Sequence, residues 1–169
     1  MKFSAQEEYG LRCLLRLGRL GDGGSLTLPE FGRAEGISVP HAAKLLRILR
    51  RGGFVKSARG QAGGYTLARP PHEIIVGEAL AALGGRLFDP GFCNVHTGTI
   101  DVCTNTPDCS IRSLWQAVQM VVDQVLSKTT LADLLRNEQK MATWVSTLVQ
   151  ISTEQLKSAG LPLHLGDSN

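Results

Sequence analysis

The sequence lacks the features that mark several large classes of protein. No apolar run approaches the roughly 18–20 residues that a helix needs to cross a bilayer. The opening residues Met1 to Phe3 are followed closely by Glu7 and Glu8, so we expect no secretion signal and a cytoplasmic protein. There is no internal repeat, and 19 glycines accompany only 7 prolines, which excludes a collagen-like or low-complexity chain. The 169 residues then fit one domain, or one domain with an appendage.

Cysteine is also scarce. Four cysteines are too few for a disulfide scaffold, and they are unevenly placed along the chain. Cys13 stands alone, and we expect it to be a small buried residue of the first helix. Cys93, Cys103 and Cys109 are close together in sequence. An odd cluster of this kind, in a chain without an export signal, points to metal or redox chemistry in a reducing cytoplasm.

Charge is divided unequally between the two halves of the chain. Residues 1–70 contain 12 Lys and Arg against 5 Asp and Glu, whereas residues 71–169 contain 6 against 10. The net charge of +3 therefore conceals a basic front half and an acidic back half. This division indicates one localised surface for a polyanion rather than a generally basic protein.

Capping patterns predict three helices in the basic half. Ser4 and Glu7 form a capping box, Thr27 and Glu30 form a second one, and Ser38 stands before a proline as a third helix start. Glycines follow each apolar pattern and predict helix ends near residues 20, 35 and 51.

A β-hairpin is predicted directly after the third helix. Residues 54–57 and 64–67 are short strand candidates on either side of a glycine-containing turn. Three short helices followed by a hairpin is the order of a winged helix-turn-helix, which we assign to residues 1–85. The predicted fold is therefore mainly α with a small β-hairpin wing.

The third helix and the hairpin carry the candidate DNA-binding residues. Positions 40, 44, 47 and 51 share one face of that helix, and its N-terminus favours phosphate. An arginine at the turn of the wing suits the narrow, negative minor groove. The candidates are Ser38, Pro40, His41, Lys44, Arg47, Arg51, Lys56, Arg59 and Gly60. The alternative is a solvated, charged helix beside a tight turn.

The sequence of the acidic half predicts helices before and after one long irregular segment. A short helix is predicted over 74–83, and residues 86–109 show no period and include the three clustered cysteines. From Ser110 a wide apolar stripe follows at helical spacing, so more than one surface of this helix must be covered. We assign 110–137 to this long dimerisation helix and a short helix after it, and 138–169 to a helical extension and tail.

The clustered cysteines are candidate metal ligands. Thiolates are soft ligands that select iron–sulfur clusters or zinc, although the C-x-x-C pair of common zinc sites is missing. Three thiolates leave one position for another ligand. His96 lies in the same segment, while Glu7 and Glu8 are distant in sequence and could arrive through the fold or from a partner chain. The alternative is that these cysteines occur in the segment by chance and bind no metal.

Several segments resemble the IscR/NsrR-type bacterial regulators, which are winged-helix dimers whose DNA binding is governed by an iron–sulfur cluster. The most specific match is GGFVKSARGQAGGYTLAR from Gly52 to Arg69, which is similar to the family's helix-to-wing signature. The opening residues, the segment CTNTPDC from Cys103 to Cys109 and the helix after it also resemble the family. The resemblance covers about residues 1–137.

The resemblance implies a role for each of these residues. Cys93, Cys103 and Cys109 would be cluster ligands, and Arg59 would enter the minor groove. A histidine that serves as fourth ligand in one branch is replaced here by Arg112. In the nitric-oxide-sensing branch the fourth ligand is an acidic residue near the N-terminus of the partner subunit, and Glu8 stands at that position.

The resemblance therefore predicts a homodimeric repressor, not an enzyme, that binds a roughly palindromic double-stranded operator. The expected cofactor is an iron–sulfur cluster, with 4Fe–4S favoured over 2Fe–2S, and the signal is redox state, nitric oxide or iron supply. One alternative is a regulator of the same fold without a cluster, using thiol oxidation, zinc or a small molecule. A more distant alternative is a thiol oxidoreductase.

Overall fold

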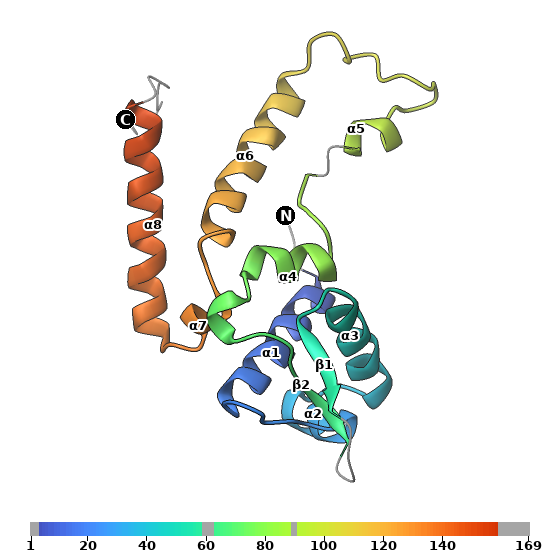
Figure 1. The fold of residues 1–169 in the computed structure, drawn as a ribbon. Coiled ribbons are helices and arrows are strands. Elements are labelled where there is room, and N and C mark those ends of the chain that lie inside the picture. The colour runs from blue at the N-terminus through green and yellow to red at the C-terminus, as the bar shows by residue number, and fades with distance from the viewer. Residues whose placement is uncertain (1–3, 59–62, 89–90, 159–169) are drawn as a thin grey trace. The chain divides into compact units, whose positions relative to one another are not determined.

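The computed structural model describes residues 4–58, 63–88 and 91–158, in two compact units that divide between Leu135 and Arg136. The first unit contains helices, one short 3-10 helix and a two-stranded antiparallel sheet (Figure 1). Its elements are α1 (Ala5–Arg19), α2 (Leu28–Glu35), α3 (Val39–Arg51), β1 (Val55–Ala58), β2 (Gly64–Leu67), η1 (Pro71–Glu73), α4 (Val76–Leu83), α5 (Phe92–Val95), α6 (Ser110–Leu126) and α7 (Leu131–Leu134). The mainly α fold with a hairpin wing is confirmed.

The predicted helix starts are confirmed by their caps. The Ser4 amide donates to the Glu7 carboxylate at 2.7 Å, and the Thr27 amide donates to Glu30 at the same distance. The hydrogen bonds from the Thr27 amide and hydroxyl lower the pKa of the Glu30 carboxyl, because they stabilise its charged form. The Ser38 hydroxyl accepts from the amide three residues later, so α3 begins at the predicted residue.

One hydrophobic core joins α1, α2, α3, the wing, α4 and α7. Phe31 is completely buried at its centre, and Leu45, Leu46 and Leu49 present the inner face of α3 to it. Burial of this kind is the dominant stabilising term in a small domain. Because α3 is held by three leucines on one side, its opposite side is fixed toward solvent.

A buried carboxylate fixes α2 against α1. Glu35 has a side chain only 4 % exposed, and it accepts from Arg12 Nε at 2.8 Å and from Arg16 Nε at 2.7 Å. The hydrogen bond to Glu35 raises the pKa of the Arg12 guanidinium. Just beyond Glu35, Gly36 takes a left-handed conformation with φ of 66° and turns the chain into α3.

The wing is hydrogen-bonded to the rest of the domain at its base. Val55 pairs with Leu67 in register, and Tyr65 forms a bridge to Leu26 in the connection before α2. Gly64 has φ of +135°, and a Cβ there would lie 2.7 Å from the Leu26 carbonyl oxygen. This close approach explains the glycine at the start of β2.

Two predicted boundaries move because of contacts between distant residues. The first strand was expected to begin at residue 54, but the Phe54 amide donates to the Leu49 carbonyl at 3.0 Å and closes the end of α3. The helix expected over 74–83 begins at Val76, because Ile74 accepts a hydrogen bond from the Leu131 amide and so remains extended. Residue 75 pairs there with Thr130.

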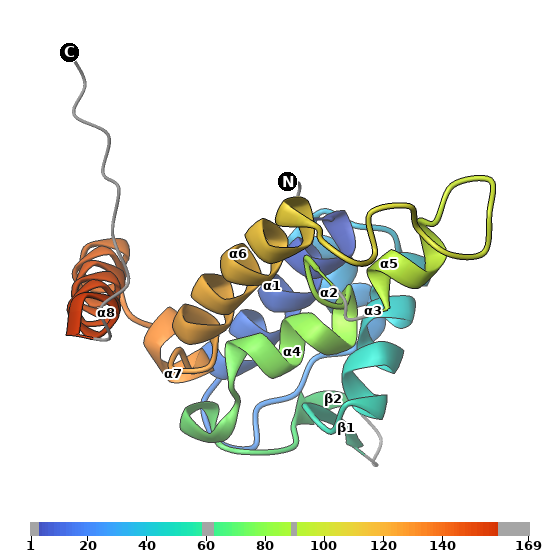
Figure 2. The same cartoon turned by 90° about the horizontal axis from the view of Figure 1, so that it is seen from above.

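The segment after α4 is irregular as predicted, apart from the four-residue helix α5. It leads to α6, which lies against α4: a Cβ on Gly77 would lie 3.2 Å from the Leu126 side chain (Figure 2). Within α6 the residues Ile111, Leu114, Trp115, Met120 and Val121 are exposed. Within the first unit, α4 therefore leaves one face of the apolar stripe exposed, and the covering of that face by a further surface stays a prediction.

The second unit contains α8 (Glu138–Ser158), a helix of 21 residues at the predicted position. Thr143, Ser146 and Thr147 donate their hydroxyls to the carbonyl groups four residues earlier. Leu148 is buried. Among the described helices, none combines the length and hydropathy that crossing a bilayer requires.

Candidate functional site

The outer face of α3 is a basic surface. Lys44, Arg47 and Arg51 are exposed on it, and Ser38 and Pro40 are exposed at its N-terminal end. A helix N-terminus carries partial positive charge and free amides, and three cationic side chains follow it along one side. This combination suits a polyanion such as a nucleic acid backbone, with side chains free to reach base edges.

His41 differs from its neighbours because it also contacts the body of the domain. Its ring lies edge-on to Tyr9 of α1, with 5.7 Å between ring centroids. The Arg12 guanidinium covers the same tyrosine ring at 5.0 Å from its centroid. His41 therefore helps to position α3 on α1, and it is half-buried where the other candidates on α3 are exposed.

The wing contributes one described candidate. Lys56 is exposed on β1, where it pairs with Thr66 of β2. The other two candidates, Arg59 and Gly60, lie outside the described residues. Their assignment to the wing turn remains a prediction from the sequence.

The four cysteines occupy two kinds of environment. All four are free thiols. Cys13 is completely buried in the core, and burial raises the pKa of its thiol to about 12. Cys93, Cys103 and Cys109 are half-buried in the segment that links α4 to α6. The core assignment of Cys13 is confirmed, and the other three remain accessible to a ligand or an oxidant.

The three accessible thiols lie on separate parts of their segment. Cys93 is in α5, and Cys109 is the N-cap of α6. Cys103 lies at a turn, where its backbone carbonyl oxygen accepts hydrogen bonds from the amide and hydroxyl of Thr106. The Cys109 sulfur accepts from the Arg112 amide at 3.4 Å. Across the described residues, no three His, Cys, Asp or Glu side chains come close enough together to hold a metal ion. Cysteine sulfur is the kind of soft ligand that iron–sulfur clusters and zinc select, so the chemistry of the three side chains fits such a group although their placement in one chain does not assemble it.

The two candidate fourth ligands have different surroundings. The His96 ring stacks on Phe92 with 3.9 Å between centroids, and its Nδ1 lies 2.8 Å from the Phe92 carbonyl oxygen. Glu8 is exposed in the first turn of α1, while Glu7 beside it is occupied by the capping box. Glu8 is therefore open to a group from outside its own helix.

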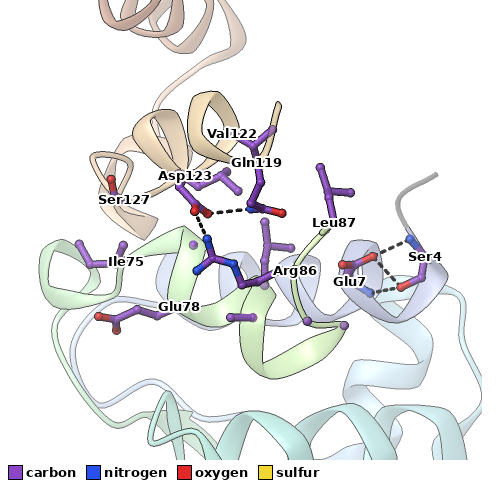
Figure 3. Close-up of a pocket in the computed structure, with 16 residues that line it drawn as sticks. Ser4, Glu7, Ile75, Glu78, Arg86, Leu87, Gln119, Val122, Asp123 and Ser127 are labelled. Carbon is purple, nitrogen blue, oxygen red and sulfur yellow. Dashed lines mark hydrogen bonds and ion pairs between the residues drawn. The ribbon is translucent and has the colours of Figure 1, made fainter. Parts of the chain in front are cut away.

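A cleft of about 830 Å³, lined by both apolar and polar side chains, lies between α6 on one side and α4 with the start of α1 on the other (Figure 3). On its α6 side Gln119 and Asp123 point toward Arg86, which follows α4. The sequence interpretation did not single out these three residues. A signal was present, because Gln119 interrupts the apolar stripe of α6 at a position between Val118 and Val122.

Comparisons with known proteins give one consistent result. Residues 3–137 match the model of the Rrf2 family, described as iron-dependent transcriptional regulators. The chain is 31 % identical over 137 residues to the protein rrf2 of Nitratidesulfovibrio vulgaris, covering 81 % of this chain and 89 % of that protein.

Solved structures agree with this match. The structure of T. potens IscR has a TM-score of 0.62 and 32 % identity, covering 80 % of this chain and 86 % of that one. The structure of CymR, the global cysteine regulator of B. subtilis, has a TM-score of 0.62 and 28 % identity, covering 80 % and 96 %.

The burial of Cys13 predicts a division in thiol reactivity. In native, metal-free protein at pH 8, we expect three thiols to react with a water-soluble disulfide reagent and Cys13 to react only after unfolding, because its raised pKa and burial suppress the thiolate. Mass spectrometry of the labelled peptides identifies each site. Native labelling of Cys13 at the rate of Cys103 would contradict the assignment, and Cys13→Ser provides the control.

Proposed function

Since the chain belongs to the Rrf2 family of transcriptional regulators, we propose that it is a homodimeric repressor whose operator affinity is set by an iron–sulfur cluster. The matched family is one of transcriptional regulators and not of enzymes, so the oxidoreductase hypothesis is set aside. The observation that carries the proposal is the presence of two features in the first unit. One is α3, which we call the reader helix, with its exposed basic face. The other is the segment 86–109, which we call the thiol segment, with three free, half-buried thiols.

DNA recognition would use the outer face of α3 and the wing. The major groove accommodates one α-helix, and the leucines on the inner face of α3 leave Lys44, Arg47 and Arg51 directed outward. Lys56 and the predicted wing residue Arg59 would contact the adjacent backbone and minor groove. Two copies related by a twofold axis would read a roughly palindromic operator.

We expect Lys44→Ala and Arg47→Ala each to lower operator affinity by roughly 10-fold, because each removes a cationic contact. For a residue that contacts phosphate, the slope of log affinity against log salt should fall by about 1. Arg59→Ala should cause a comparable or larger loss. Gel shifts or anisotropy on a duplex selected from random sequence measure these values.

The exposed Lys128 between α6 and α7 offers a matched control. Lys128→Ala should retain the affinity and the salt slope of the unaltered protein. Equal losses in all four variants would indicate a general charge effect and contradict the assignment of α3 and the wing.

Dimerisation would use the uncovered face of α6. Leu114 is 56 % exposed and Val121 is 50 % exposed, although both belong to the apolar stripe. A second copy of the same helix offers an apolar face of matching length, as the isologous contact of a twofold dimer requires. The exposed apolar side chains would then leave water together.

We expect Leu114→Glu and Val121→Glu to shift the protein from dimer to monomer, since each buries a carboxylate in an apolar interface. Light scattering after gel filtration measures the mass. Gln116→Glu is the control, because Gln116 is exposed on the same helix and already polar. A mass unchanged by both apolar substitutions would overturn the α6 interface.

Cluster binding would use Cys93, Cys103 and Cys109 of one chain and Glu8 of the other. Thiolates suit iron, and a carboxylate is a harder ligand that exchanges more readily, which suits a sensor. When bound, such a group supplies iron that reacts with oxidants and nitric oxide. Cys109 caps α6, so a ligand held there acts at the foot of the proposed dimer helix.

Regulation would follow because the three thiols and Glu8 belong to elements that lead to α6 and to the winged domain. The thiol segment ends on α6, and Glu8 belongs to α1, which packs on α3. Holding thiols and carboxylate together would fix α6 of one copy relative to the winged domain of the other. Release would change the spacing of the two reader helices and, with it, operator affinity.

Anaerobic purification tests this part directly. We expect a coloured protein containing iron and sulfide, with the colour lost in Cys93→Ser, Cys103→Ser and Cys109→Ser and kept in Cys13→Ser. Glu8→Ala should change the absorption spectrum while the thermal unfolding temperature stays close to that of the unaltered protein. A colourless protein with one zinc per chain would refute the cluster.

A second candidate is a regulator of the same fold that senses through its thiols alone. It is favoured by the separation of Cys93, Cys103 and Cys109 in the chain and by the likeness to CymR, described as a cysteine regulator. Under this alternative, operator affinity follows the number of free thiols and is independent of iron content.

A further inference from the structure

The polar group buried on α6 connects that helix to the start of the thiol segment. Within α6, all of which the structure describes, Gln119 is the single buried residue, at 6 % exposure. Its side-chain oxygen accepts from the Phe88 amide at 2.8 Å, and its side-chain nitrogen donates to Asp123 Oδ1 at 2.8 Å. A buried amide is costly unless both its ends are paired, and here both are.

Asp123 extends this connection back to the winged domain. Its second carboxylate oxygen accepts a hydrogen bond from Arg86 Nη2 (Figure 3). Together with the bond from the Phe88 amide to Gln119, this attaches both Arg86 and Phe88 to α6. We call the group Arg86, Phe88, Gln119 and Asp123 the Gln119 joint. Arg86 and Phe88 begin the irregular segment, and the same segment ends at Cys109, the N-cap of α6. Both ends of the thiol segment are therefore attached to one helix.

The same region also contacts the first turn of α1. Gln6 Nε2 donates to the Leu83 carbonyl at the end of α4. A Cβ on Gly84 would lie 2.5 Å from Glu7 Oε1, so the chain leaving α4 passes directly beside the residue that precedes Glu8. The joint thus lies where the thiol segment, α6 and the start of α1 meet.

The charged groups around the cleft are already engaged within the chain, which favours a structural connection over a ligand site. Arg86 pairs with Asp123, Glu7 accepts from Ser4, and Glu78 lies 3.7 Å from Arg69. A ligand would have to displace these contacts.

We propose that the Gln119 joint couples the thiol segment to α6, so that a displacement of the segment is transmitted to the helix instead of being absorbed by a loose connection. The proposal rests on the proposed function, because the thiol segment is displaced only if its thiols sense a signal. Gln119 acts here as a positioning residue: it touches neither DNA nor any sulfur ligand, and its effect passes through Phe88 and Asp123.

Amide hydrogen exchange in metal-free protein tests the joint without involving a cluster. Gln119→Leu keeps the side-chain size and removes both hydrogen bonds, so exchange in peptides containing Phe88 should rise roughly 10-fold, as expected for loss of one buried hydrogen bond. Gln116→Leu, on an exposed position of the same helix, should leave this exchange unchanged. Peptides from α3 report whether either variant disturbs the winged domain.

The second arm measures transmission as the ratio of operator affinities between iron-loaded and metal-free protein. We expect Gln119→Leu to bring this ratio at least 5-fold closer to 1, on the order of a typical coupling between sites, while cluster spectrum and thermal stability are kept. Asp123→Asn, which keeps an acceptor for Gln119, should have a smaller effect on exchange. Unchanged Phe88 exchange in Gln119→Leu would overturn the joint.

The two arms separate failure of this inference from failure of the proposed function. Raised exchange with an unaltered affinity ratio would overturn transmission and leave iron sensing intact. An affinity ratio of 1 in the unaltered protein would instead refute iron sensing, and transmission with it, whatever the exchange shows.

Discussion

The arrangement of this protein depends on one geometric constraint: α6 has a wider apolar arc than its neighbours in the first unit cover. One side of the helix packs on α4 through Leu126 and buries Gln119, whereas Leu114 and Val121 face water. Exposed apolar area of this extent favours association. The proposed homodimer would cover this apolar area, and it would place two basic reader helices on one assembly.

The division of charge follows the same architecture. The basic half forms the helix-turn-helix and wing, and Lys44, Arg47 and Arg51 are exposed on the outer face of α3, where phosphate can reach them. Within that half, Arg12 and Arg16 pair with Glu35 while their side chains stay partly exposed, so part of the positive charge stabilises the packing of α1 on α2. The acidic half contains α6, the proposed dimerisation helix, and the three accessible thiols, and neither role requires a polyanion.

Local sequence signals predicted most of the fold, and long-range contacts account for the rest. Capping boxes at Ser4 and Thr27 are short-range patterns, so the helix starts could be read directly. The start of α4 could not, because it is set by pairing of the 74–76 segment with residues 129–131. The exposed face of α3 followed from helical periodicity. The Gln119 joint did not, because its partners are 31 residues apart in the chain.

The attachment of the wing has a mechanical consequence. Tyr65 of β2 exchanges two backbone hydrogen bonds with Leu26 before α2, and Phe54 joins the first strand to the end of α3. The reader helix and the hairpin therefore form one rigid unit. Their relative position is fixed, because several paired backbone groups would have to open together before it could change. Under the proposed function, such a unit would meet its operator half-site in a single orientation. If two copies bind one operator as proposed, a change in operator affinity would then come from a change in the distance between the two rigid units, and not from a change in the shape of either.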